Sequence, residues 1–278
     1  MGKICCFVLF VFYILSPAAS AHAAEGLTLW IHPYLPATEL IDRFSPLTQY
    51  LSEKLDRPVS IRIQQSYQAH LDFVGRDQAD LAYVGPVSYL RITEQYGPKP
   101  LLVKLEVNGA PFFHGMIITR ADSGIHALSD LAGKSFAFGD PNSTMAHIVP
   151  RAMLHNAGIS VEALGKHDFL ASHHDVALGV LGGYFDAGAV KEEVFYEFEK
   201  KGLKMVAQSP PIPEHLFVAR TSLPRELVEE IRLLLVNIGQ SPDKTAILRS
   251  IKADITNLVP VSDRDYDTLR GLVQSLDL

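Results

Sequence analysis

Two adjacent hydroxyl side chains, Ser143 and Thr144, stand where a predicted strand gives way to a predicted helix. The apolar run 134–138 predicts the strand, and segment 145–156 has helical spacing and ends before Gly158. Ser and Thr are favoured N-cap residues, and a helix start has unpaired N–H groups and the positive end of the helix dipole. The chemistry expected there is oxyanion binding. The alternative is that Ser143 only caps its own helix.

The sequence shows no recognisable catalytic or metal-binding motif. None of its eleven His residues lies in a His-Glu-x-x-His pattern, and no Cys or carboxylate cluster has zinc spacing. Ser143 and His173 could act as a nucleophile and a base, but there is no Gly-x-Ser-x-Gly motif and no obvious carboxylate to orient the His. We therefore expect a protein that is not an enzyme, with no catalytic residue, no metal and no cofactor.

Short apolar segments alternate with amphipathic segments along the chain. Such alternation is typical of an α/β protein with largely parallel sheets covered by helices on both faces. Ligands bind these sheets beyond the carboxyl ends of the strands, which is where Tyr34, Tyr83 and Ser143 fall. Strands are predicted at 27–32, 58–64, 80–84, 101–107, 115–119, 134–138, 167–170, 185–190, 204–208 and 215–219, and helices at 39–55, 67–76, 87–96, 145–156, 175–181, 224–238 and 265–276.

The amino-terminal segment 1–24 has the features of a secretory signal peptide. Lys3 supplies a positive charge, segment 4–15 is apolar but too short to cross a bilayer, and small residues ending at Ala21 or Ala23 offer cleavage sites. Both Cys residues lie in this segment, so the exported chain is expected to have no disulfide. An uncleaved membrane anchor is the alternative.

Charge and hydropathy limit the expected partners. The net charge is −6 with His neutral, and the charged residues are interspersed. The sequence has no basic patch of the kind that would indicate a nucleic-acid partner. No second apolar segment is long enough to cross a membrane. A chain of this length can bury a core large enough to fold without disulfides.

The chain carries a set of short motifs in a fixed order, which are Pro33-Tyr34-Leu35-Pro36, Phe44-Ser45-Pro46-Leu47 with Tyr50-Leu51, Asp80-Leu81-Ala82-Tyr83-Val84-Gly85-Pro86, Leu128-Ser129-Asp130-Leu131-Ala132-Gly133-Lys134, Phe138-Gly139-Asp140-Pro141-Asn142-Ser143-Thr144, Ser172-His173 and Asp186-Ala187-Gly188-Ala189-Val190. In these motifs the chain resembles the periplasmic solute-binding proteins of phosphate, phosphite and phosphonate ABC transporters. Each motif is weak alone, but together they cover nearly all of the chain after the signal segment.

This resemblance implies the two-lobed fold of type II periplasmic binding proteins, an α/β fold in which each lobe has a doubly wound, mostly parallel sheet. The first lobe would contain residues 25–112 and 210–278, and the second residues 113–209. The Pro-rich segment 209–213 suits a return crossing between lobes, and closure around a ligand would be a hinge motion. The implied partners are a small oxyanion and an ABC permease with its ATPase, with the membrane reached only through the permease.

The resemblance also implies roles for particular side chains. The family's anion contacts fall on Ser143 and Thr144. His173 would donate a hydrogen bond to the same anion, with a charge that rises when the anion binds. Tyr34 and Tyr83 would supply ring walls and hydroxyl donors.

A further residue and three departures from the family's pattern concern specificity. Asp186 would face the cleft and accept from a protonated ligand oxygen or an amine, although a capping role fits the sequence equally well. Met145 stands where the family commonly has another Ser, and His174 stands in place of an acidic residue. Lys191 stands where an acidic or small polar residue is frequent. In the cleft, Lys191 would favour a more negative ligand and disfavour an aminoalkyl group.

The expected function is therefore capture of phosphonate, phosphite or a related phosphorus oxyanion in the periplasm for an ABC importer. Two alternatives remain open from the sequence. One is a protein of the same fold that serves a sensor kinase. The other is a binder of a different oxyanion or small organic acid, such as a sulfonate.

Overall fold

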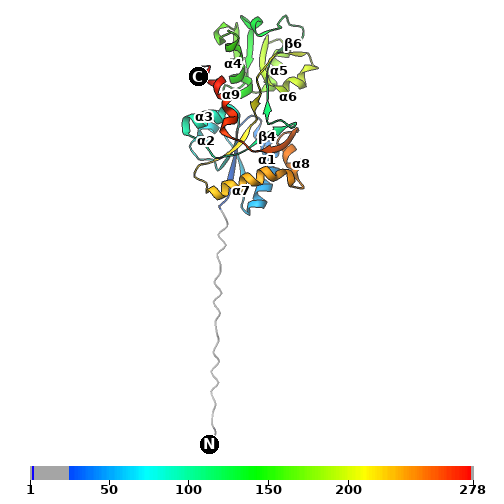
Figure 1. Cartoon of the computed structure of the whole chain (residues 1–278). Helices are drawn as coiled ribbons and strands as arrows, with labels where there is room; N and C mark the ends of the chain where they lie inside the picture. Colours follow the sequence, from blue (N-terminus) through cyan, green and yellow to red (C-terminus); the bar gives the residue numbers. More distant parts are fainter. Residues whose placement is uncertain (1, 3–24, 277–278) are drawn as a thin grey trace.

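The computed structural model describes Gly2 and residues 25–276. Two large β-sheets, each covered by helices, are joined by crossing segments of chain (Figure 1). The predicted signal peptide, apart from Gly2, lies outside the described residues, and so do both Cys residues. Within the described residues, no helix combines the length and the apolar character needed to cross a membrane.

The first unit is a six-stranded sheet whose strands come from two separate stretches of the chain. Its elements are β1 (Leu27–Ile31), α1 (Ala37–Leu55), β2 (Val59–Ile63), α2 (Tyr67–Gly75), β3 (Leu81–Val84), α3 (Pro86–Tyr96), β4 (Leu101–Val107), β12 (Leu216–Ala219), α7 (Arg225–Val236), α8 (Lys244–Ile251), β13 (Ile255–Val259) and α9 (Asp267–Gln274). The strand order is β13-β4-β12-β3-β1-β2. Helices α1, α7 and α8 share one buried apolar cluster with the sheet, and α2, α3 and α9 share another. Both faces of the sheet are therefore covered.

The second unit is a five-stranded sheet with the order β10-β6-β9-β7-β8. Its elements are β6 (Gly115–Arg120), β7 (Ser135–Phe138), α4 (Val149–Asn156), β8 (Lys166–Phe169), α5 (His173–Leu181), β9 (Ala187–Lys191), α6 (Glu192–Glu199) and β10 (Leu203–Gln208). A two-stranded sheet of β5 (Phe112–Phe113) and β11 (Ile212–Pro213) lies where the chain crosses between the units. Short 3₁₀ turns are Leu128–Leu131, Val161–Ala163, Asn237–Gln240 and Asp263–Tyr266.

The predicted α/β class is confirmed, but the sheets are mixed rather than mostly parallel. In the first unit β1 pairs in parallel with β2 and β3, whereas β12 is antiparallel to both β3 and β4. In the second unit β6 is antiparallel to β9 and β10. The path of the chain explains this. A strand that leaves a unit and a strand that returns to it run in opposite directions, as β4 and β12 do.

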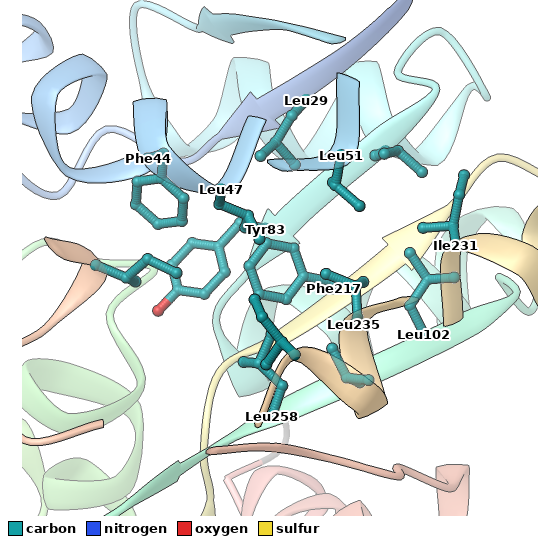
Figure 2. Close-up of a cluster of buried hydrophobic side chains, with 14 of the residues drawn as sticks. Leu29, Phe44, Leu47, Leu51, Tyr83, Leu102, Phe217, Ile231, Leu235 and Leu258 are labelled. Carbon is teal, nitrogen blue, oxygen red and sulfur yellow. The ribbon is translucent and has the colours of Figure 1, made fainter. Parts of the chain in front are cut away.

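The core of the first unit holds Tyr83 in place. Side chains alternate between the two faces of a strand. Leu27, Leu29 and Ile31 of β1 therefore point to the same face, and all three are buried. The Tyr83 ring lies with its centroid 5.0 Å from that of Phe44 and 5.0 Å from that of Phe217. In Figure 2 the hydroxyl oxygen of Tyr83 lies at the edge of this cluster, while its ring is surrounded by apolar side chains. The core therefore fixes the direction of a hydroxyl group.

Gly139 allows the end of β7 to touch the helix that follows. Its N–H donates to the carbonyl of Ala146 at 2.9 Å. A Cβ at position 139 would lie 2.4 Å from the Cβ of Ala146, closer than real Cβ atoms approach. Glycine is thus required by close approach of the two segments.

We predict that Gly139→Ala destabilises the protein by about 1–3 kcal/mol, because the added methyl group forces the helix start away from β7. Urea unfolding followed by circular dichroism measures the change. Gly271→Ala is the control, since a Cβ there meets no atom within 4 Å. It lies in α9, so we expect no loss and a gain of up to about 1 kcal/mol. Equal changes in the free energy of unfolding for the two substitutions would contradict the close contact between Gly139 and Ala146.

Candidate ligand-binding pocket

A pocket of about 80 Å³ lies between the two units, at the carboxyl ends of strands from both sheets. Tyr34 follows β1 and Tyr83 lies in β3 of the first unit. Ser143 follows β7, and Lys191 is the last residue of β9 in the second unit. All four residues line the pocket. The structure thus brings together, in one place, the three strand-end residues that the sequence singled out.

The hydroxyl groups of Ser143 and Thr144 are both anchored by main-chain N–H groups. Oγ of Ser143 accepts from the N–H of Ala146 at 3.2 Å, so Ser143 caps its own helix and also lines the pocket. Oγ1 of Thr144 accepts from the N–H of Val87 at 3.1 Å, a bond between the two units. A hydroxyl that accepts one hydrogen bond still has its proton to donate. Both residues can therefore donate to an oxyanion.

The main chain at this helix start offers further donors. The helix opens with a π-helical turn, Thr144–Ile148, and continues as α4. The N–H of Ser143 donates to the carbonyl of Asp140 at 2.8 Å, and that of Ala146 is used by the cap. The first N–H groups of a helix have no partner within it, so those of Thr144 and Met145 are left for a ligand. Together with the helix dipole they favour an anion.

A second helix start meets the first across the pocket. Helix α3 begins at Pro86, with Gly85 as its N-cap residue. Gly85 and the buried Ser88 both line the pocket. The positive ends of two helix dipoles, one from each unit, therefore converge on the same space.

The tyrosines at the pocket are hydrogen-bond donors. Burial raises the pKa of Tyr34 to about 12, and it raises the pKa of Tyr83 well above its ordinary value. Both hydroxyls keep their protons at physiological pH. Tyr67, which the sequence analysis did not select, also lines the pocket, and burial raises its pKa as well.

His173 is a neutral donor rather than a cation. Its Nδ1 accepts a hydrogen bond from the N–H of Lys191 at 3.0 Å, so the ring proton lies on Nε2. Burial, followed by the charge of Lys191, lowers the pKa of His173 to about 3. The ring lines the pocket and stays uncharged at physiological pH. The expectation that its charge rises with the anion stays a prediction, and it would require Nδ1 to give up the hydrogen bond from Lys191.

Asp186 does not face the pocket, and the expectation that it contacts the ligand is wrong. It precedes β9, at the end of that strand opposite Lys191. A strand of this length spans roughly 15 Å, so residues at its two ends cannot share one small site. The carboxylate accepts from the N–H and the hydroxyl of Ser135 at 2.8 and 2.7 Å. These hydrogen bonds hold the pKa of Asp186 below its usual value, as expected of a capping role.

The three departures from the family's pattern have different positions. Met145 is buried and lines the pocket. Lys191 also lines it, with Nζ 2.9 Å from a carboxylate oxygen of Glu193. His174 is exposed, and its Nε2 lies 3.0 Å from Glu197. Only the first two can influence a ligand directly.

Sequence reasoning missed a chain of charged groups on one side of the pocket. Nζ of Lys252 lies 3.0 Å from Glu214 and also contacts Glu193 of the second unit. Burial acts to lower the pKa of Lys252, but the two carboxylates raise it to about 12. Glu214 directly follows the Pro-rich crossing segment 209–213, and a charge at that position was the available signal.

Two further pocket residues were also missed. The ring of His32 stacks on Tyr34 and Tyr83, with centroid distances of 4.7 and 5.3 Å. Burial, followed by the charges of neighbouring His side chains, lowers the pKa of His32 well below its ordinary value. Arg43 lines the pocket and is held by Glu39, one turn earlier in α1.

Within residues 25–276, no group of three or more His, Cys, Asp or Glu side chains is placed to hold a metal ion. The chemistry of the pocket is instead that of hydrogen-bond donors and compensated charges. Such a lining binds a polar, acceptor-rich ligand.

Two α/β units with a donor-lined pocket between them are typical of solute-binding proteins. Residues 29–266 match the family described as "ABC transporter, phosphonate, periplasmic substrate-binding protein". The match spans most of the chain, and the chain belongs to this family. Its members are solute-binding proteins, not enzymes.

Individual relatives are similar to the chain over most of its length. The phosphate-import protein PhnD of Mycolicibacterium smegmatis is 28% identical, over 88% of this chain and 84% of its own. The phosphonates-binding periplasmic protein of Escherichia coli is 24% identical, over 86% of this chain and 73% of its own. The structure of PhnD1 from Prochlorococcus marinus in complex with methylphosphonate is similar with a TM-score of 0.78 and 21% identity, over 90% of this chain and 98% of that one. This likeness confirms the expected fold.

We predict that replacing Ser143 and Thr144 together by Ala weakens oxyanion binding about a hundredfold or more. The double variant loses two hydroxyl donors, each worth roughly 1.5–3 kcal/mol toward a charged ligand, and keeps the N–H groups. Isothermal titration calorimetry with inorganic phosphate and methylphosphonate measures the change.

Ser66→Ala is a matched control for the lost helix cap. Oγ of Ser66 accepts from the N–H of Ala69 at 3.2 Å, the same distance as at Ser143, but Ser66 caps α2 outside the pocket lining. The control is expected to lose about 1 kcal/mol of stability and no affinity. Unchanged affinity in the double variant would show that the anion binds elsewhere.

Proposed function

We propose that this protein captures a small phosphorus oxyanion, namely a phosphonate, phosphite or phosphate, in the pocket between its two units. The family's description and the names of the relatives support this ligand class. The single observation that carries the proposal is the helix start at Ser143 and Thr144, where anchored hydroxyls and free N–H groups meet in the pocket. A phosphorus oxyanion offers several acceptor oxygens, which this set of donors satisfies.

The charged groups of the lining are paired with carboxylates. Arg43, Lys191 and Lys252 line the pocket, against one carboxylate, Glu214. Each cation has a carboxylate partner, so none is buried alone. These pairs leave the charged groups at the pocket nearly balanced, so the helix starts, N–H groups and hydroxyls supply the attraction for an anion.

The size of the pocket limits the ligand. A pocket of about 80 Å³ is small, which favours a compact ligand. Phosphite, phosphate and methylphosphonate are compact oxyanions.

The two units act, in this proposal, as the two lobes of a binding protein. Their limits are 25–112 with 210–278, and 113–209, with the crossing segments as the hinge. Segment 1–24 directs export and is removed, which leaves the protein in the periplasm. The closed, liganded form delivers the anion to an ABC permease with its ATPase. Hydrogen bonding between Thr144 and Val87 across the units supports closure as a hinge motion.

The direct test is a calorimetric panel of phosphite, phosphate, methylphosphonate, 2-aminoethylphosphonate and taurine with the protein lacking segment 1–24. The proposal expects at least one phosphorus oxyanion to bind more tightly than the sulfonate taurine. Failure of every phosphorus oxyanion to bind would reject it.

We predict that 2-aminoethylphosphonate binds at least tenfold more weakly than methylphosphonate. Its ammonium group would meet the ammonium of Lys191, and like charges at short range repel. Lys191→Gln should narrow the ratio of the two affinities, whereas Lys200→Gln, on the exposed end of α6, should leave it unchanged. The same ratio in wild type and Lys191→Gln would show that Lys191 does not face the substituent.

A further inference from the structure

His215 is a pocket residue for which neither sequence pattern nor family resemblance suggested a role. It lies on the returning crossing segment, between β11 and β12, and it lines the pocket. Its ring centroid lies 5.4 Å from that of His32, 5.4 Å from that of Tyr83 and 5.5 Å from that of Phe113. The ring is therefore held in one orientation, with 24% of the side chain exposed.

Glu214 decides which ring nitrogen of His215 always carries a proton. One carboxylate oxygen of Glu214 lies 3.1 Å from Nδ1 of His215 and also accepts from the main-chain N–H of His215. Burial acts to raise the pKa of Glu214, but the hydrogen bond from His215 and the charge of Lys252 lower it to about 2. The ionised carboxylate can only accept, so Nδ1 donates. Nε2 is left for another partner.

Nε2 of His215 borders the helix start that the anion is proposed to occupy. A Cβ placed at Gly85 would lie 3.6 Å from Nε2 of His215 and 3.8 Å from Oγ1 of Thr144. Both atoms therefore edge the same small space, and Gly85 lines the pocket. In the part of the chain that the structure describes, the only hydrogen-bond contact of the His215 ring is the one between Nδ1 and Glu214.

The charges around His215 are nearly balanced without an anion. The titratable groups that face it or lie close to it across the pocket are His32, Tyr83, His173, Lys191, Glu193, Glu214 and Lys252. His32, Tyr83 and His173 are neutral because burial opposes their charged forms. The two lysines oppose a second proton on the ring, and the two carboxylates favour it. An oxyanion beside Nε2 adds negative charge and shifts this balance toward the protonated ring.

We propose that His215 is a ligand-binding residue that takes up a proton when the oxyanion binds, with Glu214 as its positioning partner. The proposal rests on the oxyanion function proposed above. The proton added to Nε2 comes from solvent, and the resulting N–H donates to an oxygen of the anion, while Nδ1–H stays on Glu214. His173 contrasts with this, because its Nδ1 is already occupied by the N–H of Lys191.

The consequence is a pH-dependent affinity. Imidazole is the side chain that ordinarily titrates between pH 5 and 8, and proton uptake on binding means that affinity rises as pH falls through that range. The oxyanion itself also titrates there. A comparison between wild type and a His215 variant with the same ligand separates the proton uptake by His215 from the titration of the oxyanion.

The test is calorimetric titration of methylphosphonate and inorganic phosphate, at pH 7, in buffers that differ in ionisation enthalpy. Wild type is expected to take up more protons per bound anion than His215→Gln does, by a fraction of one proton. The variant should bind roughly 10- to 100-fold more weakly at pH 6, with a smaller difference at pH 8. His174→Gln is the control, because His174 is exposed and paired with Glu197 outside the pocket lining, and it should match wild type.

Equal proton uptake in wild type and His215→Gln would overturn the proposal. Absence of binding of every phosphorus oxyanion by wild type would instead reject the proposed function, so the two failures are distinguishable. Circular dichroism of the ligand-free variant checks its folding.

Nuclear magnetic resonance gives a second readout that does not depend on an affinity change. The ring signal of His215 is identified by its loss in His215→Gln. Methylphosphonate is expected to move the titration midpoint of this signal to higher pH, and Glu214→Gln is expected to move it to lower pH. A midpoint that is the same with and without methylphosphonate would overturn the proposal.

Discussion

Three polar side chains at the pocket use their acceptor atoms on the protein's own main chain, and this constraint leaves their hydrogens for a ligand. The oxygen of Thr144 accepts from Val87, the oxygen of Ser143 accepts from its own helix, and Nδ1 of His173 accepts from Lys191. Each side chain keeps a hydrogen that is not used in these bonds. A pocket that presents donors selects a ligand that offers acceptors. Phosphorus oxyanions meet this requirement, and an amine does not.

The same arrangement explains why the pocket needs no free cation. An unpaired buried charge is costly, whereas a paired one is tolerated when its hydrogen bonds are satisfied. Lys252 is shared between Glu214 and Glu193, and Lys191 is paired with Glu193 as well. Helix dipoles, N–H groups and hydroxyls then supply the attraction for an anion. Because these groups are polar rather than ionic, they remain stable in the protein without a ligand.

Local signals carried most of the sequence prediction, and contacts between distant segments account for its failures. Ser143 and Thr144 were found because a strand, a turn and a helix start follow one another in the chain. The prediction that Asp186 contacts the ligand was wrong because it followed the family resemblance rather than the rule that ligands bind at the carboxyl ends of strands. The residue at the carboxyl end of β9 is Lys191, which lines the pocket. In the fold, helices α6 and α8 and strand β13 were not predicted from the sequence. Glu214 was missed because its buried ion pair with Lys252 joins segments far apart in sequence.

The pocket is complete only when both units contribute to it, and this links binding to closure. The bond from Val87 to Thr144 and the contact of Lys252 with Glu193 join the first unit to the second. Separation of the units would break both and would expose the donors at Thr144 to water. An anion can shift the equilibrium between open and closed forms only by its differential affinity for them. In the proposed hinge motion the donors of the two helix starts converge only when the units are together, so an oxyanion that contacts both units has that differential affinity, and a ligand that touches one unit alone does not.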